Sequence, residues 1–406
     1  MKFGAGRAAI IVLDGLGTGP APDTAAYGDT GSDTLGNVAR AVGGLKLPNL
    51  ERLGLGRCRD ASGGGGEGVG GGGGVSGLSS QVTPTAAYGV ARPASAGKDS
   101  TTGHWEMCGV RLETAFPTYP KGFPVPLLDE FSRRTKRGWL GNKAASGTGI
   151  IDELGAEHQR TGNWIVYTSA DSVFQIAAHE QTVPVAELYQ ACAVAREMLN
   201  GEHAVSRVIA RPFEGQQGDY RRTPRRKDFS IAPTGTTLLD RMADAGVTRI
   251  GIGKVDDLFA GRNIRSEHTA TNADAYRLIE QALDTLDTGF VFVNVIEFDQ
   301  TWGHRNDVAG FHQGLQELDA WIPRLGARLR ADDVVVVTAD HGNDPTTPST
   351  DHSREVVPIL VLGPGVRPVA LGTRRTFADM GQTVAEYFGL PALATGTSFL
   401  KELTSE

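Results

Sequence analysis

Residues 334–341 read Val-Val-Val-Val-Thr-Ala-Asp-His, and this stretch decides the fold. An uninterrupted apolar run of this length is typical of a strand that is buried on both faces, as in a parallel sheet covered by helices. The run ends in Asp340 and His341. Because ligands of open α/β sheets collect at the carboxyl ends of the strands, we expect these two side chains to belong to a functional site.

Other apolar runs alternate with helical patterns along the chain, which predicts an α/β fold with a mostly parallel sheet flanked by helices. The clearest helix is Phe311–Arg330, where apolar residues recur at three- and four-residue spacing. Pro323 should kink this helix. The strand candidates are Ala8–Leu13, Ile250–Ile252, Val291–Ile296, Val334–Thr338 and Val356–Leu362.

The composition is that of an acidic globular protein. Its 406 residues suffice for about two domains, and 40% of them are apolar. The net charge of −7 argues against non-specific binding of nucleic acid, which needs a positive surface. Ala8–Leu13 is too short for a signal peptide, and no run approaches the ~20 apolar residues of a membrane span, so we expect no membrane partner. Three widely spaced cysteines form neither a CxxC pair nor a disulfide framework, which favours the reducing cytoplasm.

Two stretches interrupt the pattern. Residues 62–77 are nearly all glycine, and such a tract buries too little surface to offset its ordering entropy, so we predict a disordered loop insertion. Residues 115–235 read as a second α/β unit. It contains a strand at Trp164–Thr168, an amphipathic helix near Val185–Leu199 and the basic stretch Arg221–Lys227.

Carboxylates and imidazoles follow three of the predicted strands. A lone aspartate after a strand is often a helix cap or turn residue, and this alternative stays open for Asp14, which precedes Gly15. The combined set is better explained by two divalent cations, which clamp the oxygens of an in-line phosphoryl transfer when they lie ~3.5–4 Å apart. Mixed oxygen and nitrogen donors admit Mn²⁺, Zn²⁺ or Mg²⁺. The six candidates are Asp14, Asp299, His304, Asp340, His341 and His352.

A second candidate segment, residues 97–106, reads Gly-Lys-Asp-Ser-Thr-Thr-Gly-His-Trp-Glu. Its consecutive hydroxyl residues could simply cap a helix, and the spacing alone leaves this alternative open. The same position also suits a nucleophile. A helix N-terminus stabilises an anionic phosphate, and a metal-bound hydroxyl loses its proton more easily than a free one.

Residues 97–106 resemble the nucleophile segment of the phosphopentomutases, which are members of the alkaline phosphatase superfamily. Residues 337–344, 351–355, 167–172 and 207–212 fit the same family pattern. The resemblance covers essentially the whole chain outside the glycine tract. It implies an alkaline-phosphatase-like catalytic core made of residues 1–114 and 236–406, and a smaller α/β cap domain inserted at 115–235.

The resemblance also implies roles for individual residues. The phosphorylated threonine of the family corresponds to Ser100, which keeps the hydroxyl and lacks the methyl group, and Thr101 is the alternative nucleophile. We expect Mn²⁺ as the metal. One ion would be held by Asp14, Asp340 and His341, and the other by Asp299, His304 and His352. The implied substrate contacts are Asp171, Arg211, Arg226 and Lys254.

The activity that this resemblance implies is the interconversion of ribose or deoxyribose 1-phosphate and 5-phosphate. It would run through a phosphoserine enzyme and a bisphosphate intermediate, and a bisphosphate activator would prime Ser100. Gln300 and Thr301 stand where the family usually has apolar residues, and Gly15 and Leu16 replace its usual Ser-Val. A phosphatase, or a mutase for another sugar phosphate in a specialised pathway, is therefore an alternative. A non-catalytic metal-binding relative is disfavoured by the complete ligand set.

Overall fold

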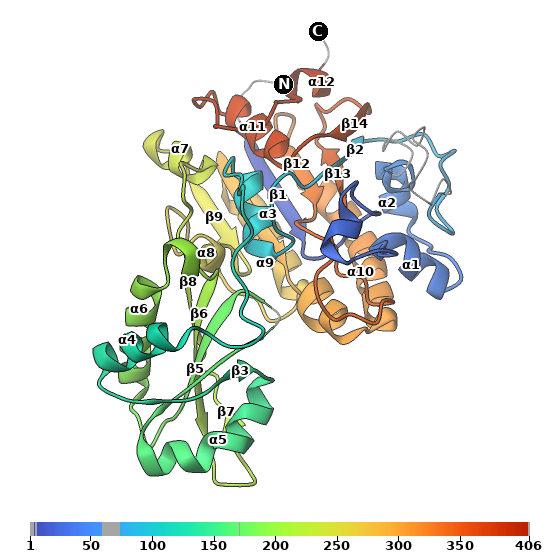
Figure 1. Ribbon diagram of the computed structural model, residues 1–406. Helices are drawn as coiled ribbons and strands as arrows, with labels where there is room; N and C mark the ends of the chain where they lie inside the picture. Colours follow the sequence, from blue (N-terminus) through green and yellow to red (C-terminus); the bar gives the residue numbers. More distant parts are fainter. Residues whose placement is uncertain (1–3, 5, 59–73, 170, 405–406) are drawn as a thin grey trace. The chain divides into compact units, whose positions relative to one another are not determined.

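A computed structural model describes residues 4, 6–58, 74–169 and 171–404, and the chain divides into two compact units (Figure 1). Unit 1 comprises Met1–Thr114 and Pro233–Glu406, and unit 2 comprises Ala115–Ala232. Unit 2 is thus inserted into unit 1 along the sequence. The catalytic and cap roles that the sequence implies for these two parts stay predictions.

Unit 1 is built on an eight-stranded sheet. Its strands are parallel to their neighbours except β13, which is antiparallel to both β12 and β2. The predicted α/β class with a mostly parallel sheet is confirmed. In spatial order the strands are β10 (Ser266–Glu267), β9 (Arg249–Ile252), β11 (Gly289–Val295), β1 (Arg7–Leu13), β12 (Val334–Thr338), β13 (Val357–Leu362), β2 (Ala87–Ala91) and β14 (Ala370–Arg374).

The strands of this sheet lie close to the positions that the apolar runs predict. β12 matches its predicted bounds, and β13 begins one residue after the predicted Val356. Every residue of β1, β11 and β12 is buried. Continuous apolar runs fit this environment because helices cover both faces of a parallel sheet.

Two groups of helices flank the sheet (Figure 1). No helix in the described ranges is long and apolar enough to cross a membrane. The helices α1 (Thr34–Ala41), α2 (Pro48–Leu53) and α9 (Asn272–Thr285) form one group around α10 (Val308–Gly326), and the second group consists of α3 (Ser100–Met107), α7 (Leu238–Asp244), α8 (Val255–Leu258), α11 (Ala378–Tyr387) and α12 (Leu400–Leu403).

Helix α10 begins and ends earlier than its periodicity predicts. Its first turn is capped by Asp307, whose carboxylate accepts the Gly310 amide at 2.9 Å, and its last residue is Gly326 rather than Arg330. Pro323 lies inside the helix and cannot donate to the Asp319 carbonyl four residues earlier. The side chain of Asn49 donates to that carbonyl at 3.0 Å instead. The proline is therefore accommodated by a contact with α2, and the predicted kink stays a prediction.

The glycine tract falls mostly outside the described residues, and the prediction of disorder is not tested for residues 62–73. Residues 74–77 are described, and for them the prediction was wrong. Val75 is buried, and the Leu45 amide donates to the Ser76 carbonyl at 2.8 Å. A tight turn that packs against the preceding loop replaces the expected disorder.

Unit 2 contains a six-stranded sheet with strand order β3-β4-β5-β6-β7, in which β8 also pairs with β6. Strand β4 and helix α6 lie where the sequence predicts a strand and a helix. The elements are α4 (Val125–Thr135), β3 (Trp139–Ala144), α5 (Gly147–Thr161), β4 (Trp164–Thr168), β5 (Val173–His179), α6 (Val185–Met198), β6 (Arg207–Glu214), β7 (Arg221–Arg222) and β8 (Lys227–Ser230).

Alternation along β4 divides the interior of unit 2 into two hydrophobic clusters. Trp164 and Val166 pack on the side of α4 and α6, whereas Ile165 and Tyr167 pack on the side of α5. The fully buried His158 closes the end of α5. Its Nδ1 donates to the Asn163 carbonyl at 2.6 Å, and its Nε2 accepts the backbone amide of His179 at 2.8 Å. The imidazole is thereby held in one neutral tautomer.

We predict that His158 makes the stability of the protein sensitive to acid. Burial lowers the pKa of His158 from its ordinary value of 6.5, so the unfolded chain binds this proton more readily than the folded chain. The free energy of unfolding should therefore begin to fall as the pH drops through 6.5 and continue to fall toward the lower folded-state pKa. Urea unfolding at about pH 7.5 and about pH 5.5, on either side of the ordinary histidine pKa, measures this change.

The His158→Gln variant should be less stable than wild type but lose less stability between the two pH values. His312→Gln, on α10, is the matched control and should keep the wild-type dependence. An unchanged pH dependence in His158→Gln would contradict the assignment.

Candidate active site

The register of the central strands places Asp14 and Asp340 at one edge of the sheet. Val12 of β1 is paired with Thr338 of β12, and each strand is followed at once by its acidic loop. The Gly15 amide donates to Asp340 Oδ1 at 3.2 Å. Gly15 has a φ of +85°, and a Cβ there would lie 3.0 Å from the Asn343 Cβ, so a glycine suits this close approach. Both carboxylates are almost completely buried.

Asp299 reaches the same edge from a π-helical turn, Phe298–Trp302, just after β11. Single π-helical turns are rare and often occur at functional sites. Its Oδ1 accepts a hydrogen bond from Asn343 Nδ2 at 2.7 Å. Asn343 lies in the loop after β12, so this contact ties the loops after β11 and β12 together.

His352 is brought to the site by a pairing within the loop that follows β12. The amides and carbonyls of Gly342 and Ser353 exchange two hydrogen bonds, of 3.0 and 2.7 Å. This pairing sets the ring of His352 beside that of His341, with centroids 4.2 Å apart. His304 follows at 4.9 Å from His352. Three imidazoles thus converge on three carboxylates.

The ligand atoms form two overlapping groups. Asp299, His304 and His352 each offer an atom within 4.8 Å of the others, and so do Asp14, Asp299 and His341. Asp299 therefore belongs to both groups, whereas the family resemblance assigns it to one ion. Asp340 lies next to the second group, because its Oδ2 is 3.5 Å from His341 Nε2.

The electrostatics of the site are dominated by its buried carboxylates. Burial opposes the charge of Asp14, but the Lys254 ammonium, 2.7 Å from its Oδ2, and His341 hold the pKa of this carboxyl below its usual range. Burial likewise opposes the charge of His341, but Asp340, Asp14 and Asp299 raise the pKa of His341 to about 10. A field that holds a proton on a buried imidazole also attracts a divalent cation.

These residues fit divalent metal ions on their own chemistry. Carboxylate oxygens and imidazole nitrogens are the donors that Mn²⁺ and Zn²⁺ accept. Among the described residues, Asp340 Oδ2 is buried and receives no directed hydrogen bond, although His104 Nδ1 lies 3.2 Å away. A buried carboxylate oxygen without a hydrogen bond is costly unless it binds a cation. The two groups are therefore candidate sites for divalent ions.

Ser100 is the first residue of helix α3 and points at this acidic edge. Its Oγ lies 3.3 Å from Asp14 Oδ1 and 3.2 Å from His341 Nε2. Asp99 caps the helix by accepting the Thr102 amide at 3.1 Å. A Cβ at Gly103 would lie 2.3 Å from the Asp340 carbonyl oxygen, so the glycine lets α3 pack closely against the end of β12. Thr101 is also buried, but its hydroxyl makes no hydrogen bond to the described ligand residues.

The four predicted substrate contacts fall in different parts of the chain. Lys254 lies in unit 1 and pairs with Asp14, as described above. The others lie in unit 2, where Asp171 Oδ2 is 3.6 Å from Arg207 and Arg226 makes a two-pronged contact with Asp228 at 2.7 Å. Arg211 donates from Nε to Gln175 at 3.1 Å and makes no ion pair with a described residue.

Comparison with known proteins identifies the family. The sequence model of the family described as "Metalloenzyme superfamily" matches residues 6–392 of this chain. A phosphopentomutase of Carboxydothermus hydrogenoformans is 50% identical over 399 residues, which cover 98% of this chain and 99% of the relative. A phosphopentomutase of an Anaeromyxobacter species is 53% identical over 400 residues, covering 98% and 99%. This chain belongs to the phosphopentomutase family. The resemblance found in the sequence is confirmed.

Three further residues support this phosphopentomutase site without having been singled out from the sequence. His104 Nδ1 donates to the Ser100 carbonyl at 2.8 Å, one helical turn along α3. Arg354 donates to the carbonyls of Ser95 and Gly97, both at 2.6 Å, and so anchors the loop that precedes helix α3. His104 lies in residues 97–106 and Arg354 lies in residues 351–355, two segments that resemble the family. The sequence indicates a role for these two residues only through their position in those segments.

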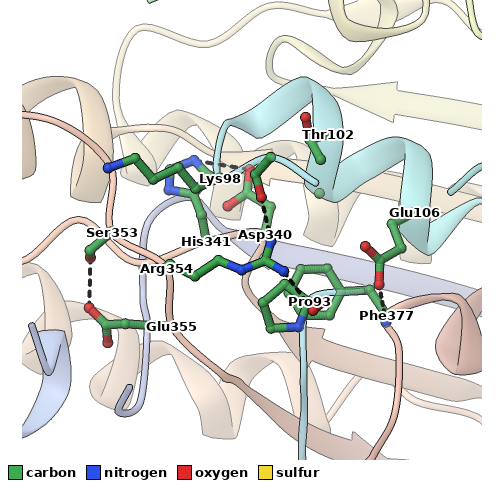
Figure 2. Close-up of a pocket in the computed structure, with 12 residues that line it drawn as sticks. Pro93, Lys98, Thr102, Glu106, Asp340, His341, Ser353, Arg354, Glu355 and Phe377 are labelled. Atoms are coloured by element: carbon green, nitrogen blue, oxygen red, sulfur yellow. Dashed lines mark hydrogen bonds and ion pairs between the residues drawn. The ribbon is translucent and has the colours of Figure 1, made fainter. Parts of the chain in front are cut away.

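Glu355 is the third of these residues. It lines a pocket with Lys98, Asp340, His341 and Arg354 (Figure 2). Its carboxylate accepts hydrogen bonds from the hydroxyls of Thr34 and Ser353, both at 2.7 Å. Burial raises the pKa of Glu355 to about 7, because the hydroxyl contacts only partly offset desolvation. Glu355 thus fixes the loop that carries His352.

We predict that the six Asp and His ligands bind two divalent ions. Elemental analysis of the purified protein should show about two ions per chain, as for other two-metal sites. His341→Ala should lower the metal content and reduce activity more than about 100-fold, beyond the usual effect of losing a residue that only orients a ligand. His312→Ala, outside both groups, is the matched control. Full metal content and full activity in His341→Ala would rule out this ligand set.

Proposed function

We propose that this chain interconverts pentose 1-phosphates and 5-phosphates through a phosphorylated Ser100. The observation that carries the proposal is the position of Ser100 Oγ, within 3.3 Å of Asp14 Oδ1 and 3.2 Å of His341 Nε2 at the first residue of α3. Family membership supports the reaction type, because the curated relatives are phosphopentomutases. Ribose and deoxyribose phosphates are the proposed substrates.

The proposed metal ions are Mn²⁺, with Asp299, His304 and His352 around one and Asp14, Asp340 and His341 around the other. When bound, they supply positive charge that favours the Ser100 alkoxide and neutralises a transferring phosphoryl group. The chain itself contributes the N-terminus of α3, whose free amides and dipole favour an anion next to Ser100. Asp99 accepts the Thr102 amide and His104 donates to the Ser100 carbonyl, and these two hydrogen bonds hold the first turn of α3 in place.

The proposed reaction runs in two transfers. Phospho-Ser100 gives its phosphoryl group to a hydroxyl of the pentose monophosphate, which produces a pentose bisphosphate and a free serine. The other phosphoryl group of the bisphosphate then returns to Ser100, and the isomeric monophosphate leaves. A bisphosphate activator would load Ser100 for the first cycle. The two steps are equivalent in bonds formed and broken, so positioning and charge stabilisation supply the catalysis.

Such a mutase must keep water away from phospho-Ser100, and we infer that unit 2 serves as the cap that does so. Asp171 and Lys254 are proposed contacts of the sugar phosphate. Arg211 is the strongest candidate for a phosphate contact in unit 2. Its guanidinium forms no close ion pair with a described residue, although the charge of Asp228 acts on it, whereas the fork of Arg226 is already engaged by Asp228.

We propose a cytoplasmic location for this reaction. The three cysteines, Cys58, Cys108 and Cys192, are all free and buried. Unpaired thiols are typical of proteins that work in a reducing compartment. A phosphorylated sugar substrate agrees with this location.

We predict that Ser100 carries the phosphoryl group. Tandem mass spectrometry after incubation with a pentose or hexose bisphosphate should locate phosphate on Ser100. Ser100→Ala should lose nearly all mutase turnover because no other hydroxyl stores the group, and Ser100→Thr should stay active because it restores the hydroxyl. Thr101→Val is the matched control and should be phosphorylated normally. Phosphate found only on Thr101 would move the role to that residue.

We predict that Arg211 binds the non-reacting phosphate. Loss of a charge-assisted contact typically costs about 1.5–3 kcal/mol, so Arg211→Ala should lower mutase turnover at least about tenfold. It should also increase the share of phosphate lost to water, because the intermediate would be held less firmly. Counting isomer and free phosphate from ribose 5-phosphate measures both effects. Wild-type turnover together with a wild-type isomer-to-phosphate ratio would contradict this role, and Arg221→Ala, an exposed neighbour on β7, is the control.

A further inference from the structure

The N-terminus of helix α5 in unit 2 has the features of an anion-binding site. The helix runs for 15 residues, and Ser146 caps it by accepting the Gly149 amide at 3.0 Å. Among the described residues, no acceptor receives a hydrogen bond from the amides of Gly147 and Thr148. Thr148 is exposed and Gly147 is half-buried, so this first turn is accessible. Free amides and the helix dipole together favour a negative group here.

A buried hydroxyl points at this first turn. Tyr167 of β4 has a relative exposure of 0%, and its hydroxyl makes no hydrogen bond to any described residue. A Cβ built on Gly147 would lie 3.1 Å from this hydroxyl oxygen, which places the oxygen at the start of α5. Burial raises the pKa of Tyr167, so the phenol keeps its proton and remains a hydrogen-bond donor. A buried donor without an acceptor destabilises the protein, so a hydroxyl of this kind at the start of a helix points to a ligand.

Positive charge surrounds the same point. Arg222 Nη1 lies 3.4 Å from the position of a Gly147 Cβ, and Arg222 makes no ion pair with a described residue. By contrast, the neighbouring Arg221 contacts Glu214 at 3.1 Å. The charge of Arg211 also acts on the Tyr167 hydroxyl. Two arginines that form no close ion pair with a described carboxylate thus act on a buried donor beside a helix N-terminus.

We propose that the first turn of α5, the Tyr167 hydroxyl and the Arg222 guanidinium form a phosphoryl-binding subsite on unit 2. The helix amides and the phenol donate hydrogen bonds to phosphoryl oxygens, and the guanidinium balances their charge. Gly147 allows the first turn of α5 to lie close to the phenol and the guanidinium because it has no side chain. The ligand class is a phosphate monoester or inorganic phosphate. Its identification as a pentose phosphate rests on the proposed function, whereas the binding of inorganic phosphate does not.

The test is calorimetric titration of the metal-loaded, full-length protein with inorganic phosphate and, separately, with ribose 5-phosphate. Tyr167→Phe and Arg222→Gln should each weaken the binding of at least one probe about tenfold or more, the usual effect of losing a contact to a charged group. Tyr220→Phe and Arg221→Gln are matched controls in the same unit and should bind like wild type. Weaker binding of both probes identifies the subsite as one for the sugar phosphate, and weaker binding of inorganic phosphate alone identifies one for free phosphate.

Wild-type affinity for both probes in Tyr167→Phe and Arg222→Gln would overturn the proposal. Thermal unfolding without phosphate supplies a second readout. Tyr167→Phe removes a hydroxyl without a partner and should be no less stable than wild type, but phosphate should raise its melting temperature less. An equal shift in melting temperature would also overturn the subsite. A protein without mutase activity that still shows these differences would refute the proposed function and leave the subsite intact.

Discussion

Three buried carboxylates beside one another impose the constraint on which the rest of unit 1 depends. Asp14, Asp299 and Asp340 have almost no contact with solvent, and their mutual repulsion is strong where the dielectric is low. Without compensating cations this arrangement would be unstable. The His341 imidazole, whose pKa is raised to about 10, and the Lys254 ammonium supply that compensation, and divalent ions would supply more.

The fold holds this charge in place through its parallel register and its loops. Pairing of β1 with both β11 and β12 fixes where the acidic loops leave the sheet. Asn343 links the loops after all three strands, because its amide donates to the Gly15 carbonyl at 2.8 Å and its side chain donates to Asp299. At the opposite end, Arg7 forms a buried ion pair with Asp333 that ties the start of β1 to the entry of β12. The strands therefore cannot slide without separating the ligands.

The elements that could be predicted from the sequence are those specified by local patterns. The valine run of β12 and the aspartate behind it indicate both a strand and a ligand position, because a parallel strand and its carboxyl end are coupled in α/β folds. Contacts between distant segments carry no such local signal. The pairing of Gly342 with Ser353, the sharing of Asp299 between both ligand groups and the contact of Lys254 with Asp14 depend on long-range packing. The ordered turn at residues 74–77 was missed for the same reason, since it is held by Leu45.

The two units carry side chains of opposite charge at the positions where we propose that they bind phosphate. In unit 1, negative side chains are concentrated at the sheet edge, and an anionic substrate can be accepted there only when cations outweigh them. In unit 2, Arg211 and Arg222 form no close ion pair with a described residue, although the chain as a whole carries a net charge of −7. Arg211 is half-buried, and burial lowers the pKa of its guanidinium, so an anion that binds there would restore part of the stabilisation that water no longer supplies. The proposed phosphate contacts of the two units therefore differ in kind: metal ions would supply the positive charge in unit 1, and arginine side chains would supply it in unit 2.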